Sequence, residues 1–388
     1  MIGQTLALFL DAYRELNAKR MFWIVLGLSG FVVLAFAVVG VKHGNLSFLW
    51  FETAIPVIFE PAELYRMMFS AFGISVWLAF AATILALIST ASIFPDFISG
   101  GSIDLYLSKP ISRLRLFVTK YAAGLLFVAL QVLVFAVASF LVLGVRGDMW
   151  EPRLFLAVPI VVCFFSYLYC VSVLVGVTTR STIAAILLTV LAWGFMFLLS
   201  SAEVGLLYFQ KQVAQESRSS ANTLKLVNGQ IAYDEKQPAE SRMPPDQMQS
   251  LRRQREELEA QINSKAARNL EIAHSIVYGV KTAAPKTSET IGLLNRWLLP
   301  PDAMTPASQR ATAADNEDEP APPKPATRGK GLFGRRADRA DRRANAENAA
   351  ELQQELNERP VWWIVGTSLG FEAVVLGLAA WIFCRRDY

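Results

Sequence analysis

Long apolar stretches alternate with short polar segments along most of this 388-residue chain. Six of the stretches have at least 20 residues, and a helix needs about 20 to cross a hydrocarbon layer of roughly 30 Å. The backbone must satisfy its own hydrogen bonds in lipid, and no stretch shows the alternation of a barrel strand, so each predicts a membrane-spanning helix. The predicted spans are Met21–Val41, Phe69–Ile93, Leu116–Val145, Leu154–Val177, Thr182–Ser201 and Val361–Cys384.

Composition divides the chain into an apolar body and a polar insert before the last span. Hydrophobic residues make up 53% of the chain, charged residues 18%, and the mean hydropathy is +0.35. Residues 202–360 hold 23 of the 37 Lys and Arg and 22 of the 33 Asp and Glu. This pattern excludes an ordinary soluble enzyme, a disordered protein and a secreted disulfide scaffold, and a net charge of +4 is too small to suggest a nucleic-acid partner.

Basic residues in the short loops predict the orientation, because cytoplasmic loops carry an excess of Lys and Arg. One side would carry ten such residues: Arg14, Lys19, Arg20, Lys109, Arg113, Arg115, Lys120, Arg180, Arg385 and Arg386. The other side would carry four: Lys42, Arg66, Arg146 and Arg153. Both termini are therefore predicted to be cytoplasmic. The insert at 202–360 is predicted to be extracytoplasmic, because long loops cross the membrane largely regardless of charge.

Two segments of the body are predicted to lie at the membrane surface. Residues 1–20 predict an amphipathic helix in the interface plane, with Leu6, Phe9 and Tyr13 on its apolar side; it is either a simple anchor or a functional element. The long third span begins with Lys120 in its first turn, and this side chain is expected to snorkel to the interface.

The insert is predicted to be helical over 202–300 and disordered over 301–350. Pro244-Pro245-Asp246 opens a helix that continues to about Tyr278, with Asp246 and Gln249 spaced as a capping box. Nine heptad core positions indicate either a weak coiled coil or a helix packed on a neighbour. They are Met248, Leu251, Arg255, Leu258, Ile262, Lys265, Asn269, Ile272 and Ile276.

The second half of the insert approaches the membrane again. Ile291–Leu299 is expected either on the outer leaflet or packed against the preceding helix. The Ala-, Pro- and charge-rich composition of 301–350 cannot bury enough surface to order a chain. Glu351–Glu358 leads helically into the last span, which with its cytoplasmic tail occupies 351–388 and places Trp362 and Trp363 at the outer interface.

Motifs for chemistry are missing from the sequence. The phosphate-cradling pattern G-x-x-x-x-G-K-[ST] does not occur, and His43 and His274 are the only histidines. The three cysteines, Cys163, Cys170 and Cys384, lie in or at the ends of apolar runs without metal-ligand spacing, so they are expected to be packing residues. We therefore predict no catalytic, metal or cofactor site on this chain.

Two polar residues lie within predicted spans. Glu372 is about a dozen residues into the sixth span, and a carboxylate at that depth is costly unless it faces a bundle interior or a cavity. It is either a group of a substrate or proton pathway, or a protonated or paired residue that holds helices together. Gln131 in the third span is a weaker case of the same kind.

The loop at 94–115 is the most sharply punctuated segment between spans. Turns are predicted at Pro95-Asp96, at Gly100-Gly101 and at Pro110, with a short helix over Ser102–Ser108 between them. Such a loop can be a plain turn or a docking element for a soluble partner.

This loop also carries a resemblance. Its pattern is an acidic residue, Gly101 and then Ser108-Lys109-Pro110-Ile111-Ser112-Arg113, in a chain with an amphipathic N-terminal helix and a sixth span ending in Arg385-Arg386. It resembles the membrane subunit of type-2 ATP-binding-cassette (ABC) transporters and is similar to the permeases of gliding motility and of nitrous oxide reductase copper-site maturation. The resemblance covers about residues 1–201 and 361–388; the long insert departs from it.

The resemblance implies a six-span all-α permease in the bacterial inner membrane, paired with a similar permease and driven by a separate cytoplasmic ATPase that binds ATP. The coupling loop would contact that ATPase through Asp96, Gly101, Asp104, Lys109, Pro110 and Arg113. The alternative is a membrane scaffold or sensor without transport, whose insert recruits envelope partners.

Overall fold

A computed structural model describes residues 20–42, 45–48, 51–56, 65, 67–99, 112–147, 150–238, 243–262, 265–298, 348–352 and 354–386. Apart from Arg20, the predicted N-terminal amphipathic helix lies outside these residues, as do the short helix over Ser102–Ser108 and positions 301–347 of the predicted linker. The prediction of disorder was wrong for 348–350, which are helical. The described residues form two compact units. The membrane bundle comprises those within 1–197, 283–322 and 360–388, and the hairpin unit those within 198–282 and 323–359.

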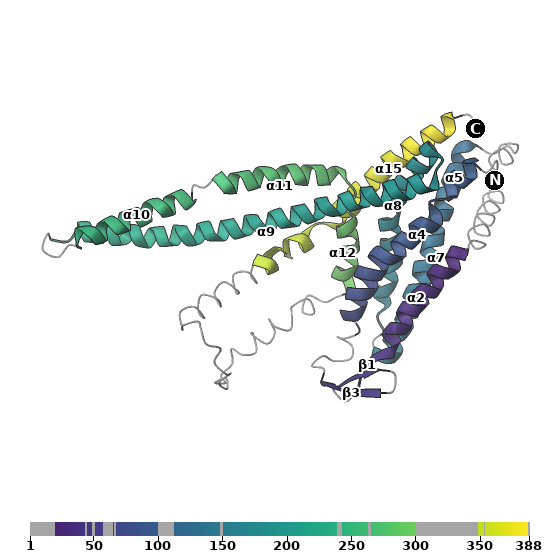
Figure 1. Cartoon of the computed structure of the whole chain (residues 1–388), viewed down its shortest axis with the longest axis horizontal. Coiled ribbons are helices and arrows are strands. Elements are labelled where there is room, and N and C mark those ends of the chain that lie inside the picture. Colours follow the sequence, from purple (N-terminus) through teal and green to yellow (C-terminus); the bar gives the residue numbers. More distant parts are fainter. Residues whose placement is uncertain are drawn as a thin grey trace. The chain divides into compact units, whose positions relative to one another are not determined.

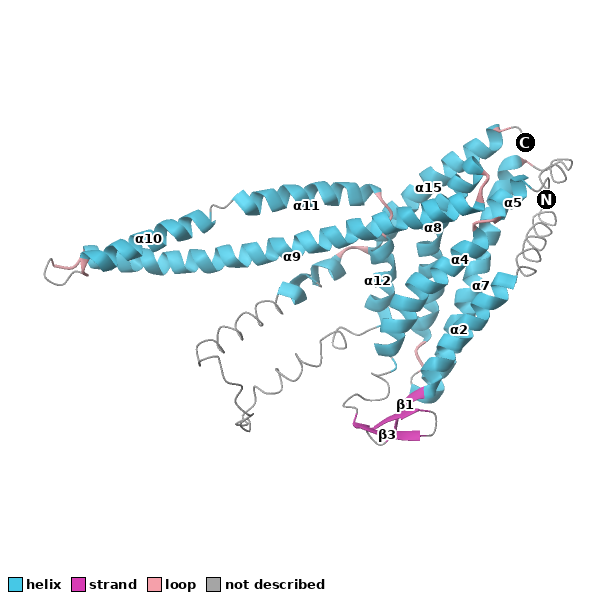
Figure 2. Ribbon diagram, in the orientation of Figure 1, coloured by secondary structure: helices cyan, strands magenta, loops and turns pink. Residues whose placement is uncertain are grey.

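The membrane bundle consists of apolar helices around a central one (Figures 1 and 2). The central helix is α8 (Ala157–Thr179), which packs against the third and sixth predicted spans. In its most apolar stretch 72% of the residues are buried, against 22–44% in the corresponding stretches of the other long helices. The other helices of the bundle are α2 (Arg20–Val38), α4 (Thr83–Thr90), α5 (Ile93–Ser99), α7 (Arg113–Gly147), α15 (Val361–Arg385) and the first part of α9 (Thr182–Glu235), up to residue 197.

The described chain contains five helical segments that are long and apolar enough to cross a membrane, and a shorter apolar sixth, Phe22–Val38. These correspond to the six predicted spans, and the protein is an all-α polytopic membrane protein apart from one small sheet. The first predicted span was too long at its end, because Val39 to Val41 belong to a strand. The chain reverses there through a small sheet. Its strands are too short to be recognised from the pattern of apolar residues.

That sheet has three short antiparallel strands, β1 (Val39–Lys42), β2 (Asn45–Phe48) and β3 (Phe51–Pro56). It is tied to the bundle by the buried Tyr65, whose hydroxyl donates to the carbonyl of Val39 over 2.6 Å. Burial raises the pKa of the Tyr65 phenol, although the neighbouring charge of Arg146 acts in the opposite direction.

The second span differs from a plain α-helix. It begins as a π-helix, η1 (Phe69–Ala82), and continues through α4 and α5. The turn predicted at Pro95-Asp96 was wrong: both residues lie in α5, within a helical segment that continues from Phe69 to Ile98. Pro is tolerated near a helix start because its missing N–H would have no partner inside the helix. Pro95 packs on α8, 3.2 Å from where a β-carbon on Gly176 would be.

One helix of the polar insert belongs to the membrane bundle. This helix, α12 (Thr287–Leu298), packs on α8, η1, α15 and the 3₁₀-helix η2 (Pro152–Leu156). Its Ile291, Leu293 and Leu294 are buried in the bundle core. The expectation of an outer-leaflet helix was therefore wrong, because the apolar face of α12 is covered by protein.

The hairpin unit contains the later part of α9, which crosses the predicted boundary at 201/202 without a break, and the helices α10 (Pro245–Ile262) and α11 (Lys265–Ala283). Pro245 is the first helical residue of α10, so Asp246 lies within the first turn and is not the N-cap that was predicted. The five heptad positions of α10 are partly buried and its other residues are exposed. The predicted register is therefore correct for this helix.

The same register is wrong for α11. Ile272 and Ile276 are 50% and 62% exposed, whereas Leu270, Ala273 and Val277 are partly buried. The partly buried positions of α11 therefore do not continue the heptad phase of α10 (Pro245–Ile262). The helix predicted over Glu351–Glu358 is present at the described residues, and Glu351 and Glu355 form ion pairs with Lys211.

Candidate functional site

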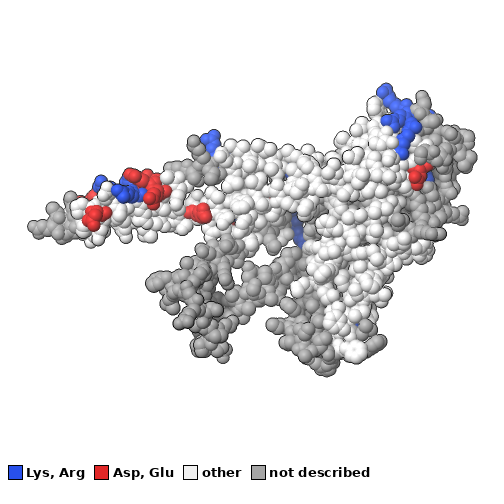
Figure 3. All heavy atoms as spheres, viewed as in Figure 1, with Lys and Arg blue, Asp and Glu red and all other residues white. Residues whose placement is uncertain are grey.

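One end of the membrane bundle collects basic side chains from three helix ends. We call it the basic end and define it by Arg113, Arg115, Arg180, Arg385 and Arg386 (Figure 3). These residues come from segments that the loop charges assign to one side of the membrane. The bundle therefore brings the positively charged loops together, as a multi-pass membrane protein requires.

Two arginines of the basic end bind the ends of other helices. The Arg113 guanidinium donates to the carbonyls of Arg386 at 2.8 Å and of Cys384 at 3.3 Å. The Arg386 guanidinium donates to the carbonyls of Val177 at 2.9 Å and Thr178 at 3.0 Å. The last carbonyls of a helix have no partner inside it and carry partial negative charge, so a cation is favoured there. The start of α7, the end of α15 and the end of α8 thus form one chain of contacts.

The other predicted coupling residues are placed as follows. Asp96 is exposed in the first turn of α5, close to the basic end. Gly101, Asp104, Lys109 and Pro110 lie outside the described residues. Their predicted contact with a partner stays a prediction.

Lys120 does not snorkel as predicted. It is 6% exposed, and its ammonium group lies 5.2 Å from the ring centroid of Phe97. A cation over an aromatic face replaces part of its lost hydration, so the side chain can remain inside the bundle instead of extending to the lipid headgroups. It joins the start of α7 to α5.

Glu372 lies at the junction of three helices. Its side chain is 8% exposed and projects from α15. Its Oε1 accepts from the Tyr121 hydroxyl of α7 and its Oε2 from Ser166 Oγ of α8, both at 2.7 Å. In the described part of the chain no Lys, Arg or His forms an ion pair with this carboxyl. Two hydroxyl donors are therefore its polar partners.

The hydroxyls can serve Glu372 in either protonation state. Ser166 Oγ also lies 2.8 Å from the carbonyl of Cys163, and the Tyr121 hydroxyl lies 3.3 Å from the carbonyl of Ser166. A hydroxyl that turns its hydrogen to a backbone carbonyl can accept one from a protonated carboxyl. The Tyr121 ring stacks on Tyr169 at a centroid distance of 5.1 Å, which fixes the direction of its hydroxyl.

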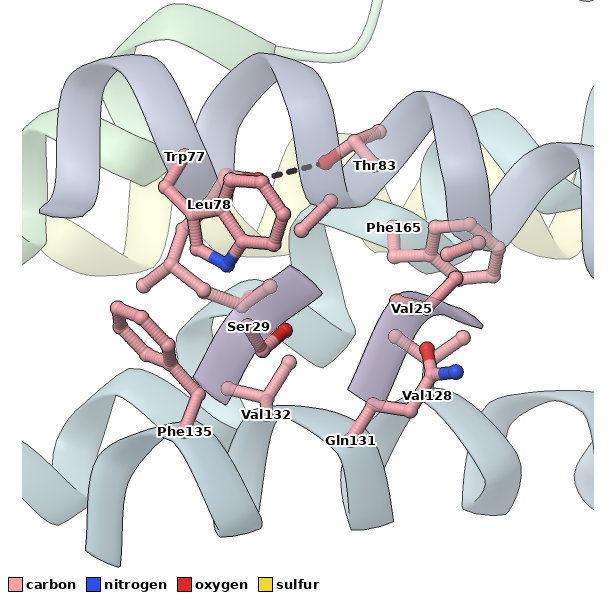
Figure 4. Close-up of a pocket in the computed structure, with 13 residues that line it drawn as sticks. Val25, Ser29, Trp77, Leu78, Thr83, Val128, Gln131, Val132, Phe135 and Phe165 are labelled. Carbon is pink, nitrogen blue, oxygen red and sulfur yellow. Dashed lines mark hydrogen bonds between the residues drawn. The ribbon is translucent and has the colours of Figure 1, made fainter. Parts of the chain in front are cut away.

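Gln131 lines a small cavity with Trp77 and Ser29 (Figure 4). It is 6% exposed, and its Nε2 has no hydrogen-bond partner among the described residues. Gln131 is therefore buried in the bundle, and no described residue binds its amide nitrogen; its proposed likeness to Glu372 stays a prediction.

The partners of Glu372 were missed by sequence analysis. Tyr121 and Ser166 lie 251 and 206 positions from Glu372, and neither residue type stands out in an apolar helix. The buried Lys286 was also missed: its Nζ lies 2.6 Å from Thr367 Oγ1 and 4.3 Å from the centroid of Trp363. A lysine next to Pro285 in a polar insert carries no sequence signal of burial.

The described residues contain no group of three or more His, Cys, Asp and Glu that could hold a metal ion, and the three cysteines are free thiols. Apolar helices of spanning length and a basic end define a multi-pass membrane protein.

The sequence model of the ABC-2 family transporter protein family matches residues 12–388, so the chain belongs to the ABC-2 transporter family. The match includes the insert as well as the predicted spans. No curated protein matches the chain, and no solved structure matches it. The chain is therefore a membrane permease of the ABC transporter class, and the narrower resemblance to gliding-motility and copper-maturation permeases stays a prediction.

Proposed function

We propose that this chain forms the translocation pathway or force-transmitting bundle of an ABC transporter, and that a separate cytoplasmic ATPase docks on the loop 94–113. The family match over residues 12–388 carries the proposal. The absence of a phosphate-cradling motif in the sequence supports ATP binding and hydrolysis on the partner. A second permease of this type would complete the pathway in the bacterial inner membrane, with both termini cytoplasmic.

The contacts at the basic end supply a physical route for coupling. The loop enters α7 at Arg113, Arg113 binds the end of α15, and Arg386 binds the end of α8. A displacement of the loop would therefore act on three helices at once. Coupling also requires the ATPase to bind the loop with different affinity in its two states.

The decisive experiment is affinity purification in mild detergent with identification of the copurifying chains. A P-loop ATPase in the complex supports the proposal, and its reproducible absence contradicts it. Cysteines introduced into Ser102–Ser108 should cross-link to that ATPase.

Arg113 needs a separate test, because it has an internal role in the bundle. Charge reversal, Arg113→Glu, is expected to uncouple ATP hydrolysis from transport while the ATPase still copurifies. A Pro placed within Ser102–Ser108 is expected to remove the ATPase from the complex. If both variants retain full coupling, the loop is not the coupling element.

Glu372 is proposed to take part in the conformational cycle, either on the pathway or as the joint between α7, α8 and α15. Glu372→Gln keeps the size and removes the charge, and we expect at least about a tenfold loss of transport-coupled ATP hydrolysis, equivalent to the loss of one hydrogen bond to a charged group. Unchanged coupling would assign Glu372 to packing alone. Ser139→Ala is the matched control, because Ser139 is buried on α7 and does not contact Glu372.

The exposed apolar face of α11 favours a second candidate, a scaffold or sensor that recruits an envelope partner. Ile272, Ile276 and Val280, four residues apart, are 50%, 62% and 47% exposed. Deletion of 301–350 separates the two functions. Lost partner recruitment with intact transport would make the insert a module on a transporter, and lost recruitment in a chain that never transports would favour the scaffold.

A further inference from the structure

A small cavity lies inside the membrane bundle, between α2, η1, α4, α7 and α8. It has a volume of about 20 Å³, and a water molecule needs roughly 10–15 Å³ measured in this way. Its walls are mostly apolar (Figure 4). The lining residues are Val25, Ser29, Trp77, Leu78, Ala82, Thr83, Ala86, Val128, Gln131, Val132, Phe135, Val161 and Phe165.

Two hydrogen-bond donors of the lining have no partner. Trp77 and Gln131 are each 6% exposed, and neither the indole Nε1–H nor the amide Nε2 is bonded to any described residue. Figure 4 shows the indole nitrogen on the edge of the ring that faces Ser29. The great majority of buried donors in proteins have a hydrogen-bond partner. Two unbonded donors in one cavity therefore indicate a missing acceptor.

No described residue accepts a hydrogen bond from either donor, although the hydroxyls of Ser29 and Thr83 also line the cavity. Thr83 Oγ1 donates to the carbonyl of Leu78 at 2.8 Å, and carbonyls within helices are occupied by the backbone ladder. The lining contains no Asp, Glu, Lys or Arg. An ion would pay a large desolvation cost in such a site without a counter-charge, so the acceptor is uncharged.

The backbone beside the cavity is also unusual. Trp77 belongs to the π-helix η1, whose 14 residues are longer than the single-turn bulges in which this geometry normally occurs. Ser75 Oγ and Thr83 Oγ1 both donate to carbonyls five residues earlier, which is the spacing of a π-helix. Segments of π-helix are frequent at functional sites, and this one places Trp77 at the cavity.

We propose that this cavity is a binding site for an uncharged oxygen acceptor, held by Trp77 and Gln131 with Ser29 beside it. The oxygen belongs either to a water molecule or to the carbonyl, ether or hydroxyl group of a lipid-like molecule. The volume accommodates the oxygen-bearing group alone, so the hydrocarbon of a larger ligand extends beyond the cavity. The proposal does not depend on an ATPase partner or on transport.

Thermal unfolding of the purified chain in lipid nanodiscs provides the first test. Gln131→Met removes one donor while keeping nearly the same volume, so its Tm decides this test. If the site is filled, the variant loses a bond and the Tm falls; if the site is empty, the variant removes an orphan polar group and the Tm rises. Trp77→Phe does not discriminate, because it also deletes buried ring atoms and lowers the Tm in either case. Ser139→Ala is the control, because Ser139 is a buried orphan on α7 that does not line the cavity.

Two labelling experiments identify the source of the oxygen. A long-chain methyl ester with a diazirine beside the ester is compared with the same hydrocarbon lacking the ester. If a lipid-like oxygen fills the site, the ester labels lining residues about tenfold more than the hydrocarbon, and Gln131→Met removes the difference. If water fills the site, X-ray hydroxyl-radical footprinting oxidises the buried Trp77 and Phe135, and Gln131→Met abolishes this oxidation.

Either labelling pattern, together with a lower Tm in Gln131→Met, supports the site. A higher Tm in Gln131→Met, or labelling and oxidation that this variant leaves unchanged, overturns the proposal. Copurification of an ATPase is unaffected by these outcomes, so the proposed function and this site fail independently.

Discussion

Two buried glutamates, one in each unit, are bound by different kinds of hydrogen-bond donor. Glu203 of the hairpin unit is fully buried and accepts from Arg359 at 2.6 Å and from the buried Lys281. Glu372 of the membrane bundle is 8% exposed and accepts from two hydroxyls. The first carboxylate has opposite charges on both oxygens, whereas the second has neutral donors on both.

This difference separates a fixed joint from an adaptable one. A buried carboxylate with two cations must stay ionised, because protonation would leave two charges in a low-dielectric interior. A carboxyl between hydroxyls can be neutral or ionised, since a hydroxyl both donates and accepts. We therefore expect the Glu203 contact to hold the hairpin unit in one arrangement and the Glu372 contact to change during function.

The largest effect is expected from Glu203→Ala. Removing one member of a buried ionic cluster leaves the others without compensation and costs about 3–5 kcal/mol. Hydrogen–deuterium exchange across α11 should accelerate strongly, because Lys281 lies near the end of that helix. An exchange rate equal to that of the wild type would show that the cluster does not stabilise the unit.

A smaller loss is expected from Gly124→Ala, which tests the packing behind Tyr121. A β-carbon at this position would lie 2.5 Å from the hydroxyl oxygen of Tyr169, the ring that stacks on Tyr121. Overpacking costs about 1–3 kcal/mol, and the shift should also weaken the Tyr121–Glu372 hydrogen bond. Gly366→Ala on α15 is the control, because no atom lies within 4 Å of its added β-carbon. Equal Tm values for the two variants would contradict the prediction.

Tyr121→Phe should cost about 1 kcal/mol, the usual net value of one hydrogen bond. Ser166→Ala should cost a similar amount. The double variant leaves Glu372 without its two described donors and should cost more than the sum of the single losses. The Tm values of the four proteins form a double-mutant cycle, and strict additivity would show that the two hydroxyls act independently.

The smallest effect is expected from Glu355→Ala, which breaks an exposed pair. Glu355 lies 3.1 Å from Lys211, and their side chains are 50% and 22% exposed. Such pairs contribute about 0–1 kcal/mol because water screens the charges. Exchange in α11 should be unchanged, and a loss as large as that of Glu203→Ala would remove the distinction between surface and buried pairs.

Local sequence pattern predicted the helices well and their partners poorly. The apolar runs located the starts of the six spans to within a few residues, although the helix of the fifth continues past the predicted end at Ser201 to Glu235. The heptad positions of α10 matched its partly buried side. The heptad register failed in α11, where Ile272 and Ile276 are exposed. The outer-leaflet position predicted for α12 was wrong as well. The sequence of an apolar helix face does not show whether lipid or protein covers it.

The sequence by itself determined that this chain spans a membrane. Helices with about twenty predominantly apolar residues match the thickness of the hydrocarbon layer and satisfy their own backbone hydrogen bonds there. It also singled out Glu372 and Gln131, because polar groups at that depth are costly. Only the tertiary structure decided what they contact. Two hydroxyls more than 200 positions away in the sequence donate to Glu372. Gln131 lines a cavity in which no described residue accepts a hydrogen bond from its amide nitrogen. Such contacts depend on which helix faces meet, and hydrophobicity along one helix does not encode that choice.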